Sequence, residues 1–428
     1  MGARRFPSCL SWRVIIVADG PALRVVSVVG LVIAPVLGAL AFGNSQLSVL
    51  GAAVAVLALV VGSVVVASVS SGNRLTVAMG VAAAFPFVFV TPSGLDLFGV
   101  LGVYLIGSAG MALASLATGM SLLRAAGFAG RQLVGFVTFV TVFAIVRSML
   151  GTTVGQSGWE VLIPFVIAGA IWFFADVGIW ALFVSGFRSV SARYLRLAGL
   201  GDANVFASLV ATGALFGLMF DALQWWALPV AMLPYSFAHS AFRRFQETRA
   251  TYKQTIRALA QIPEAAGLNL LGHADRTSAM SVAMAKDLGL TPEEVEDAEF
   301  AALMHDIGRI TLNEPTVRDQ GWTNEDLARW GSEITAGAPS LDRVSGYVRR
   351  QYEPYRKPGE ESDPTLSVVA RIVKVASAYD AASTGEGLSV LESLEQLHQG
   401  AAYEYDPEVV ATLRRVLDPD SARRSVSV

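Results

Sequence analysis

His305 and Asp306 stand side by side in the stretch AALMHDIGRI, behind an apolar run. Imidazoles and carboxylates are the ligands that proteins offer to Fe, Mn or Zn, so the pair has the composition of part of a metal site. A second histidine, His273, lies upstream in an H-x-x-R pattern with Arg276. A bare His-Asp pair also occurs at ordinary helix ends, where an imidazolium meets the helix dipole. Gly308 is suited to a left-handed cap at such an end.

Two helices are expected to position these residues. The first spans about 265–288 and carries His273 in its first half. The second begins with TPEE, where Thr291 is the N-cap and Glu294 completes a capping box. Because the connection is short, the two helices should be antiparallel neighbours. This packing would bring His273 close to His305.

The H-x-x-R pattern and the following LGLTPEEVEDAEFAALMHDIGRI resemble the HD superfamily of metal-dependent phosphohydrolases. The similarity is to its HD-GYP branch, whose members typically read LHDIGK at the second motif. VVARIVKVASAYDAAS is similar to that branch's helix ending in VADAYDAL, and YEYDPEVVATL to its closing FDPEVV segment. The resemblance covers about 265–417. It implies an all-helical domain that binds a divalent metal and acts on a cyclic dinucleotide or nucleotide.

The resemblance also implies roles for individual residues. His273, His305 and Asp306 would hold the metal, and Asp306 and Arg309 would be catalytic. Arg276 and Arg309 would bind substrate phosphate. Arg309 stands where the branch has lysine, and its planar guanidinium can hold a phosphate through two hydrogen bonds. A bound ion (Fe, Mn or Zn) would acidify water for attack on a phosphodiester.

Five further positions depart from the branch's pattern. They are Glu333, near the expected next histidine, Gln351, Tyr352 and Glu353, in place of an HHE stretch, and Ser377, in place of the aspartate of VAD. Asp380 is not a displaced ligand, because the branch has its own aspartate there. Glu333 could ligate in principle. The remaining two histidines and one aspartate can hold one ion, but a second ion would lack ligands, and two-metal hydrolysis needs both.

The rest of the chain is strongly apolar. Of its 428 residues, 53% are hydrophobic and 16% charged, whereas a soluble domain has about 25% charged residues. Residues 1–241 contain 11 arginines, no lysine and 6 acidic residues, while residues 242–428 carry a net charge of −8. The single cysteine, Cys9, excludes an intramolecular disulfide and a cysteine-based zinc site. We therefore predict an all-α protein with a polytopic helical membrane domain and a cytoplasmic helical domain.

Eight segments have the length and apolar character of a membrane span, which needs about 20 residues. They are roughly 23–42, 47–70, 75–91, 95–117, 132–150, 160–186, 203–221 and 223–241.

Arginine placement predicts the orientation of these spans. With a cytoplasmic N-terminus, most arginines fall on the cytoplasmic side, as the positive-inside rule requires. They are Arg4, Arg5, Arg13, Arg74, Arg124, Arg131, Arg188, Arg193, Arg196, Arg243 and Arg244. Arg147 lies near an outer helix end, where it is expected to snorkel. Trp159, Trp225 and Trp226 lie at the predicted outer boundary. Both termini are thus expected in the cytoplasm of a bacterium, with the spans in its inner membrane.

Asp176, in IWFFADVGIW, is the one carboxylate well inside a predicted span. An ionisable group there is costly, which makes Asp176 a functional candidate of the membrane domain. The alternative is that it faces a helix partner or a wet crevice. His239 and His398 are expected to be structural or interfacial.

The predicted domains are a transmembrane domain (1–241), a connecting amphipathic helix (242–263), an HD/HD-GYP-like domain (264–417) and a disordered tail (418–428). In the connector, Phe245, Tyr252 and Leu259 recur every seven residues. This spacing fits either a homodimer seam through 241–262 or a face that packs on the chain's own domain. Arg243, Arg244, Arg249 and Lys253 are expected near anionic headgroups.

These features predict a membrane-anchored signalling protein with a divergent HD-GYP-type domain that is weak or inactive as a phosphodiesterase. One alternative is an active metal-dependent phosphohydrolase of a cyclic dinucleotide or nucleotide. A second is a transporter or membrane scaffold that uses the HD fold as a docking module. The expected partners are the lipid bilayer, a cyclic dinucleotide or nucleotide and a second copy of the chain, but neither DNA nor RNA.

Overall fold

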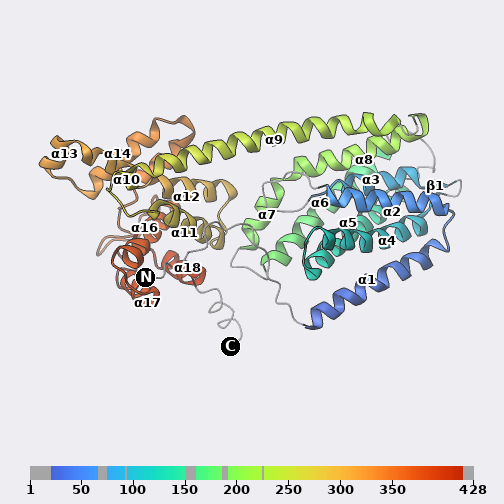
Figure 1. Cartoon of the computed structure of the whole chain (residues 1–428), viewed down its shortest axis with the longest axis horizontal. Coiled ribbons are helices and arrows are strands. Elements are labelled where there is room, and N and C mark those ends of the chain that lie inside the picture. Colours follow the sequence, from blue (N-terminus) through green and yellow to red (C-terminus); the bar gives the residue numbers. More distant parts are fainter. Residues whose placement is uncertain are drawn as a thin grey trace. The chain divides into compact units, whose positions relative to one another are not determined.

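The computed structural model of the chain describes residues 21–65, 75–91, 94–150, 161–185, 191–223 and 226–417. The chain divides into an N-terminal unit (Met1–Phe187 and Ala198–Arg244) and a C-terminal unit (Arg188–Leu197 and Phe245–Val428). The predicted tail (418–428), Trp159, Trp225 and several of the predicted cytoplasmic arginines lie outside the described residues. The predicted all-α class is confirmed, since helices dominate both units (Figure 1).

The N-terminal unit is a bundle of apolar helices. Its helices are α1 (Pro21–Phe42), α2 (Val49–Val64), α3 (Ala78–Val88), α4 (Leu97–Ala117), α5 (Leu122–Met149), α6 (Leu162–Ser185) and α8 (Ala203–Leu223). A two-residue antiparallel pair, β1 (Val90–Thr91) and β2 (Gly94–Leu95), joins α3 to α4. Within the bundle, α4 packs against α1, α2 and α5, α5 against α6, and α3 against α8.

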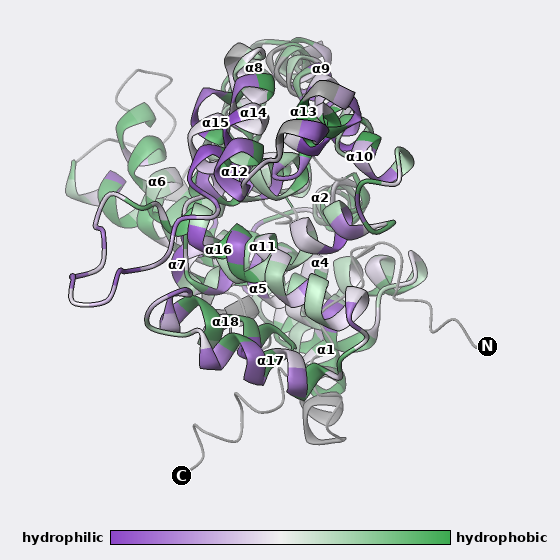
Figure 2. Ribbon diagram, turned by 90° about the vertical axis from the view of Figure 1, so that its left-hand side faces the viewer, coloured by the Kyte–Doolittle hydropathy of each residue, from purple (hydrophilic) through white to green (hydrophobic). Residues whose placement is uncertain are grey.

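Four helices in the described part of the chain are long and apolar enough to cross a membrane. They are Leu97–Ala117, Leu122–Met149, Leu162–Ala181 and Ala203–Phe220. The apolar stretch Val28–Phe42 of α1 and the helices Val49–Val64 and Ala78–Val88 are shorter, so the predicted number of eight spans stays a prediction. Large apolar side chains on α4 and α6 are exposed, among them Leu113 (62%) and Phe174 (64%). Such side chains favour a lipid environment over water, and Figure 2 shows α6 as mainly hydrophobic.

Close helix contacts explain part of the high glycine content of this unit. A Cβ atom on Gly102 of α4 would lie 2.9 Å from the carbonyl oxygen of Gly38 on α1. A Cβ on Gly80 of α3 would lie 2.7 Å from the carbonyl oxygen of Leu209 on α8. Larger side chains at Gly102 or Gly80 would therefore push these helices apart, which agrees with the role of small residues in packed membrane helices.

Asp176 on α6 is buried against Arg131 of α5. The Nε atom of Arg131 donates to Oδ1 of Asp176 at 2.6 Å, and Nη2 pairs with Oδ2. Of the two interpretations of Asp176, the structure thus supports a helix partner. Arg131 was expected before a span that starts at 132, but α5 begins at Leu122. Arg147 is also buried, 5.9 Å from the ring of Phe143, and does not snorkel as expected.

The C-terminal unit is helical around a separate core. Its helices are α10 (Ile262–Ala265), α11 (His273–Asp287), α12 (Pro292–Met304), α13 (Pro315–Gln320), α14 (Asn324–Ala336), α15 (Asp342–Arg349), α16 (Val368–Asp380), α17 (Val390–Gln399) and α18 (Pro407–Leu417). α11 packs against α12, α16 and α18, and α12 against α15 and α16. The buried side chains of Met284, Leu303, Ile372 and Leu413 lie in this core. α7 (Ala192–Leu200) and α9 (Ala227–Ala260) each contribute residues to both units.

The connector and the last predicted span form one helix, α9, because no breaking residue separates them. Tyr252 packs against Phe300, with ring centroids 5.8 Å apart, and Ile256 is buried in the core of the C-terminal unit. Phe245 remains 58% exposed. The central part of the predicted seam therefore packs on the chain's own domain, while a homodimer stays a prediction.

The basic residues of the connector pair with acidic residues of the C-terminal unit. Arg249 makes two contacts to Glu296, and Nζ of Lys253 lies 2.7 Å from Glu299. Arg249 and Lys253 thus pair with carboxylates of α12, while their expected position near anionic headgroups stays a prediction.

The two helices around the His-Asp pair differ from expectation at their ends. The capping box of Thr291 and Glu294 is confirmed. The first helix starts at His273 and not at 265, because Gly267 and Gly272 adopt positive φ angles before it. Gly308 is not a left-handed cap: it lies in the 3-10 turn Ile307–Asn313, where a Cβ would lie 2.7 Å from the backbone nitrogen of Gly331. Close packing against α14 is thus the reason for a glycine there.

Candidate metal centre

His273, His305 and Asp306 converge in the core of the C-terminal unit. His273 is the first residue of α11, and His305 and Asp306 directly follow α12. The Nε2 atoms of the two histidines are 3.1 Å apart, and Oδ2 of Asp306 lies 3.6 Å from Nε2 of His273 and 3.2 Å from that of His305. All three residues are buried, and their ligand atoms lie within 4.8 Å of one another. The predicted proximity of His273 and His305 is therefore confirmed.

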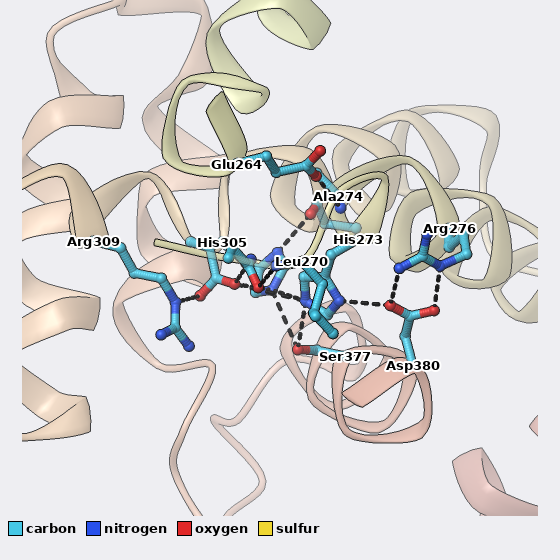
Figure 3. Close-up of polar contacts among 12 residues, drawn as sticks. Glu264, Leu270, His273, Ala274, Arg276, His305, Arg309, Ser377 and Asp380 are labelled. Carbon is cyan, nitrogen blue, oxygen red and sulfur yellow. Dashed lines mark hydrogen bonds and ion pairs between the residues drawn. The ribbon is translucent and has the colours of Figure 1, made fainter. Parts of the chain in front are cut away.

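A buried carboxylate holds His273 at the start of α11. Glu264 of α10 accepts hydrogen bonds from the backbone nitrogens of Gly272, at 2.6 Å, and Ala274, at 2.9 Å. The carboxylate therefore satisfies N–H groups that have no partner within the helix and lies at the positive end of its dipole. Figure 3 shows Glu264 close to Ala274, and Arg309 on the side of His305 that faces away from His273.

The hydrogen bonds of both imidazoles define which nitrogen carries a proton. Nδ1 of His273 donates to Oδ2 of Asp380 at 2.7 Å, and Nδ1 of His305 donates to the carbonyl oxygen of Ala302 at 2.7 Å. In their neutral forms both rings then present an Nε2 lone pair to the same point. Two lone pairs and a carboxylate at this separation need a cation between them, either a proton or a metal ion. The donor set thus fits one divalent ion.

Asp306 has three further partners. Its Oδ2 accepts from Nδ2 of Asn269 at 2.5 Å, and its Oδ1 accepts from Nε of Arg309 at 2.8 Å. The hydroxyl of Tyr352 lies 3.4 Å from Oδ1. These contacts orient the carboxylate toward the histidines. Arg309 is only partly buried, so part of its guanidinium remains accessible beside Asp306.

Ser377 lies where another ligand would complete the cluster. Its Oγ atom is 3.3 Å from Nε2 of His273 and 3.2 Å from Nε2 of His305. A hydroxyl there carries no charge and is a weaker ligand than a carboxylate. Ser377 thus contacts both imidazoles without contributing to the charge of the site.

The other positions that depart from the branch's pattern do not reach the cluster as ligands. The side-chain amide of Gln351 donates to the backbone oxygen of His305 at 2.6 Å. Glu353 is paired with Arg350, and Glu333 is exposed on α14. Among the described residues, the group of possible ligands contains neither glutamate.

Arg276 does not point its guanidinium at the cluster. Its Nε and Nη2 atoms contact the two oxygens of Asp380 at 2.6 and 2.9 Å, and Nη1 donates to the carbonyl oxygen of Leu271 at 2.9 Å. These contacts occupy the face that a phosphate would use. The geometry therefore favours a structural role for Arg276 over the predicted phosphate contact.

Burial and charge act in opposite directions on the His305–Asp306 pair. Burial favours the neutral imidazole, but the adjacent Asp306 carboxylate outweighs it and raises the pKa of His305. Burial also favours a protonated carboxyl, but His305 and Arg309 outweigh it and hold the pKa of Asp306 far below its usual range. Without metal, these effects favour the protonated imidazole of His305 beside the charged carboxylate of Asp306.

The stability of the metal-free chain should accordingly depend on pH through this pair. The depressed pKa of Asp306 contributes stability above the unfolded value of about 4, and this is lost as pH falls. The raised pKa of His305 contributes stability below the unfolded value of about 6.5, and this is lost as pH rises through the folded pKa. In chelator-treated protein, the thermal midpoint of wild type should exceed that of Asp306→Asn most between about pH 4 and 6.5. A difference that grows from pH 6.5 to pH 9 would contradict this ion pair.

Comparison with known proteins supports an HD-type domain in the C-terminal unit. Residues 257–409 match the family described as HD domain, so the C-terminal unit contains an HD-type domain. The chain is also 26% identical over 185 residues to the cyclic di-GMP phosphodiesterase response regulator RpfG of Xanthomonas campestris pv. campestris. This similarity covers 40% of the chain and 49% of RpfG, so the chain spans about half the length of that relative.

Three residues of the centre were not predicted from the sequence as parts of it. Asp380, Asn269 and Glu264 hold His273, Asp306 and the start of α11, respectively. The sequence could have indicated that Asp380 belongs to the centre, because it lies one helical turn after Ser377 on the same face of the helix. Asn269 lies in an irregular segment and Glu264 in the four-residue helix α10, and neither is long enough for a periodic pattern to indicate the direction of the side chain.

Proposed function

We propose that the chain is a membrane-anchored signalling protein whose HD-type domain has diverged from the HD-GYP branch and is weak or inactive as a phosphodiesterase. The observation that carries this proposal is Ser377, whose hydroxyl lies between the two imidazoles where the branch has an aspartate. With this substitution, the described cluster contains three ligands for a metal. Hydrolysis by two ions would need ligands for the second.

His273, His305 and Asp306 would hold one Fe, Mn or Zn ion. When bound, such an ion would act as a Lewis acid toward a phosphodiester oxygen and would acidify water. The protein's own part is to orient the ligands: Asp380 and the Ala302 carbonyl hold the rings, and Asn269 holds Asp306. Arg309, beside Asp306, is the residue that we expect to contact a substrate phosphate.

The apolar helices of the N-terminal unit support the membrane anchor. In the proposed division, residues 1–241 form the transmembrane part, 242–263 the connecting helix and 264–417 the HD-type domain. α9 is one continuous helix with residues in both units, which suits a relay of a membrane signal. The proposed ligand is a cyclic dinucleotide, which rests on the similarity to RpfG over the HD-type domain.

Metal content of the purified full chain tests the proposed site. We expect at most one Fe, Mn or Zn ion per chain by elemental analysis, and its loss in His305→Ala. Glu333→Gln is the matched control, because Glu333 is exposed and lies outside the cluster, so its metal content should equal that of wild type. Two or more ions per chain, both lost in His305→Ala, would overturn the assignment of a depleted site.

A second candidate is an active hydrolase with a single ion. It is favoured by the convergence of both Nε2 lone pairs on Asp306, since some catalytic metal sites use only three protein ligands. Such an enzyme would show metal-dependent turnover that disappears in His305→Ala.

A further inference from the structure

Asp380 is a buried carboxylate that does not itself face the point where the metal ligands converge. It is 2% exposed at the end of α16, and all of its partners are on the side of α11 or in the turn that follows α16. Its Oδ2 accepts from Nδ1 of His273 at 2.7 Å. Oδ1 accepts from Nε of Arg276 at 2.6 Å and from the hydroxyl of Thr384 at 3.2 Å.

Arg276 limits how Asp380 can move. The guanidinium contacts both carboxylate oxygens, and its remaining Nη1 is fixed by the carbonyl oxygen of Leu271. A bidentate pair of this kind restricts rotation of the carboxylate. Figure 3 shows the side chains of Arg276, Asp380 and His273 one after another in space, with the His273 ring between Asp380 and His305.

The consequence is a fixed tautomer of His273. A carboxylate accepts but does not donate, so the ring must carry its proton on Nδ1 and present its Nε2 lone pair to His305 and Asp306. The other tautomer would place an N–H where a metal would bind. Carboxylates behind ligating histidines fix ring orientation and increase ligand basicity in many metal sites.

We propose that Asp380 is a positioning residue that holds His273 in its metal-binding tautomer, and that Arg276 serves this site by fixing Asp380 and not by binding substrate. The part that concerns metal rests on the proposed function. The tautomer of His273 is a property of the metal-free protein. The proposed tautomer and the proposed metal binding can therefore fail separately.

Histidine-selective 15N labelling of the full chain gives a direct test, because the chain contains only four histidines. In chelator-treated wild type, His273 should show a single tautomer with the proton on Nδ1. In Asp380→Ala, this signal should split between tautomers or move to the form with the proton on Nε2. The Ala302 carbonyl holds His305, so the 15N signals of the His305 ring should stay as in wild type. These signals therefore report whether the site remains folded.

Asp380→Asn covers the case in which Asp380→Ala fails to fold. The single oxygen of the amide should accept from the charged guanidinium of Arg276, which turns the amide nitrogen, a donor, toward Nδ1 of His273. His273 should therefore lose its single tautomer here too. Asp363→Asn is the control, because Asp363 is an arginine-paired carboxylate of the same domain that is 44% exposed. An unchanged tautomer of His273 in a folded Asp380 variant would overturn the proposal.

Zinc titration supplies the second readout. The affinity for Zn²⁺ should fall about 10- to 100-fold in the Asp380 variants, and remain at the wild-type value in Asp363→Asn. Loss of the tautomer with unchanged Zn²⁺ affinity would refute the positioning role. If wild type binds no Zn²⁺, the metal part of the proposed function fails, and the tautomer comparison alone decides whether Asp380 sets the His273 ring.

Discussion

A chain with Ser377→Asp should bind a divalent metal more tightly than wild type, by at least about tenfold. The Ser377 hydroxyl already lies 3.3 and 3.2 Å from the two Nε2 atoms, so a carboxylate on the same Cα reaches the same point. It would add both a fourth ligand and a negative charge to the cluster. Each tenfold gain in affinity corresponds to about 1.4 kcal/mol, which one charged ligand can supply.

Ser377→Asn is the matched control for this experiment, because it has nearly the same volume as aspartate but no charge. Affinities for Mn²⁺ and Zn²⁺ would be measured on chelator-treated full chains. We expect Ser377→Asp to bind these ions more tightly than wild type. The affinity of Ser377→Asn should be equal to that of wild type or lower. An aspartate variant that binds no more tightly than the asparagine variant would show that Ser377 does not occupy a ligand position.

Replacing Asp176 with alanine should destabilise the N-terminal unit by about 3–5 kcal/mol. The carboxylate is 2% exposed and holds Arg131 through two contacts between α5 and α6. Without it, the Arg131 side chain, which is 12% exposed, would keep its charge in apolar surroundings without a partner. The free energy of unfolding in detergent, from denaturant titration, measures this effect.

The double variant Arg131→Met with Asp176→Leu separates the ion pair from simple loss of packing. Replacing a buried ion pair by apolar side chains is often neutral, so this variant should recover most of the lost stability. It also tests Asp176 as a functional candidate: if function is lost while stability returns, the charges themselves are needed. Equal destabilisation in the single and double variants would contradict an ion pair as the source of the effect.

Local sequence patterns predicted those parts of the structure that depend on neighbouring residues. The capping box at Thr291 and the approach of His273 to His305 follow from motifs and from a short connection. The number of spans is harder to predict, since apolar composition does not show where a helix ends, and four helices in the described ranges are both long and apolar enough to cross a membrane.

The remaining features depend on contacts between distant residues. Asp380 follows His273 by 107 positions, and Asp176 follows Arg131 by 45, so no local pattern links them. Gly308 was interpreted from its place at a helix end, whereas α14 packs closely enough to exclude a side chain there. Ser377 was recognised as a substitution, but its position between the two imidazoles required the fold.

Hydrolysis of cyclic di-GMP by the purified full chain tests the central claim most directly. The assay would supply Fe²⁺, Mn²⁺ or Zn²⁺ and compare wild type with His305→Ala, in which the cluster loses a ligand. We expect wild type to turn over cyclic di-GMP no faster than His305→Ala, or only slowly and in proportion to a single bound ion. Rapid metal-dependent turnover by wild type, equal to that of an intact enzyme of the HD-GYP branch and absent in His305→Ala, would contradict a weak or inactive domain.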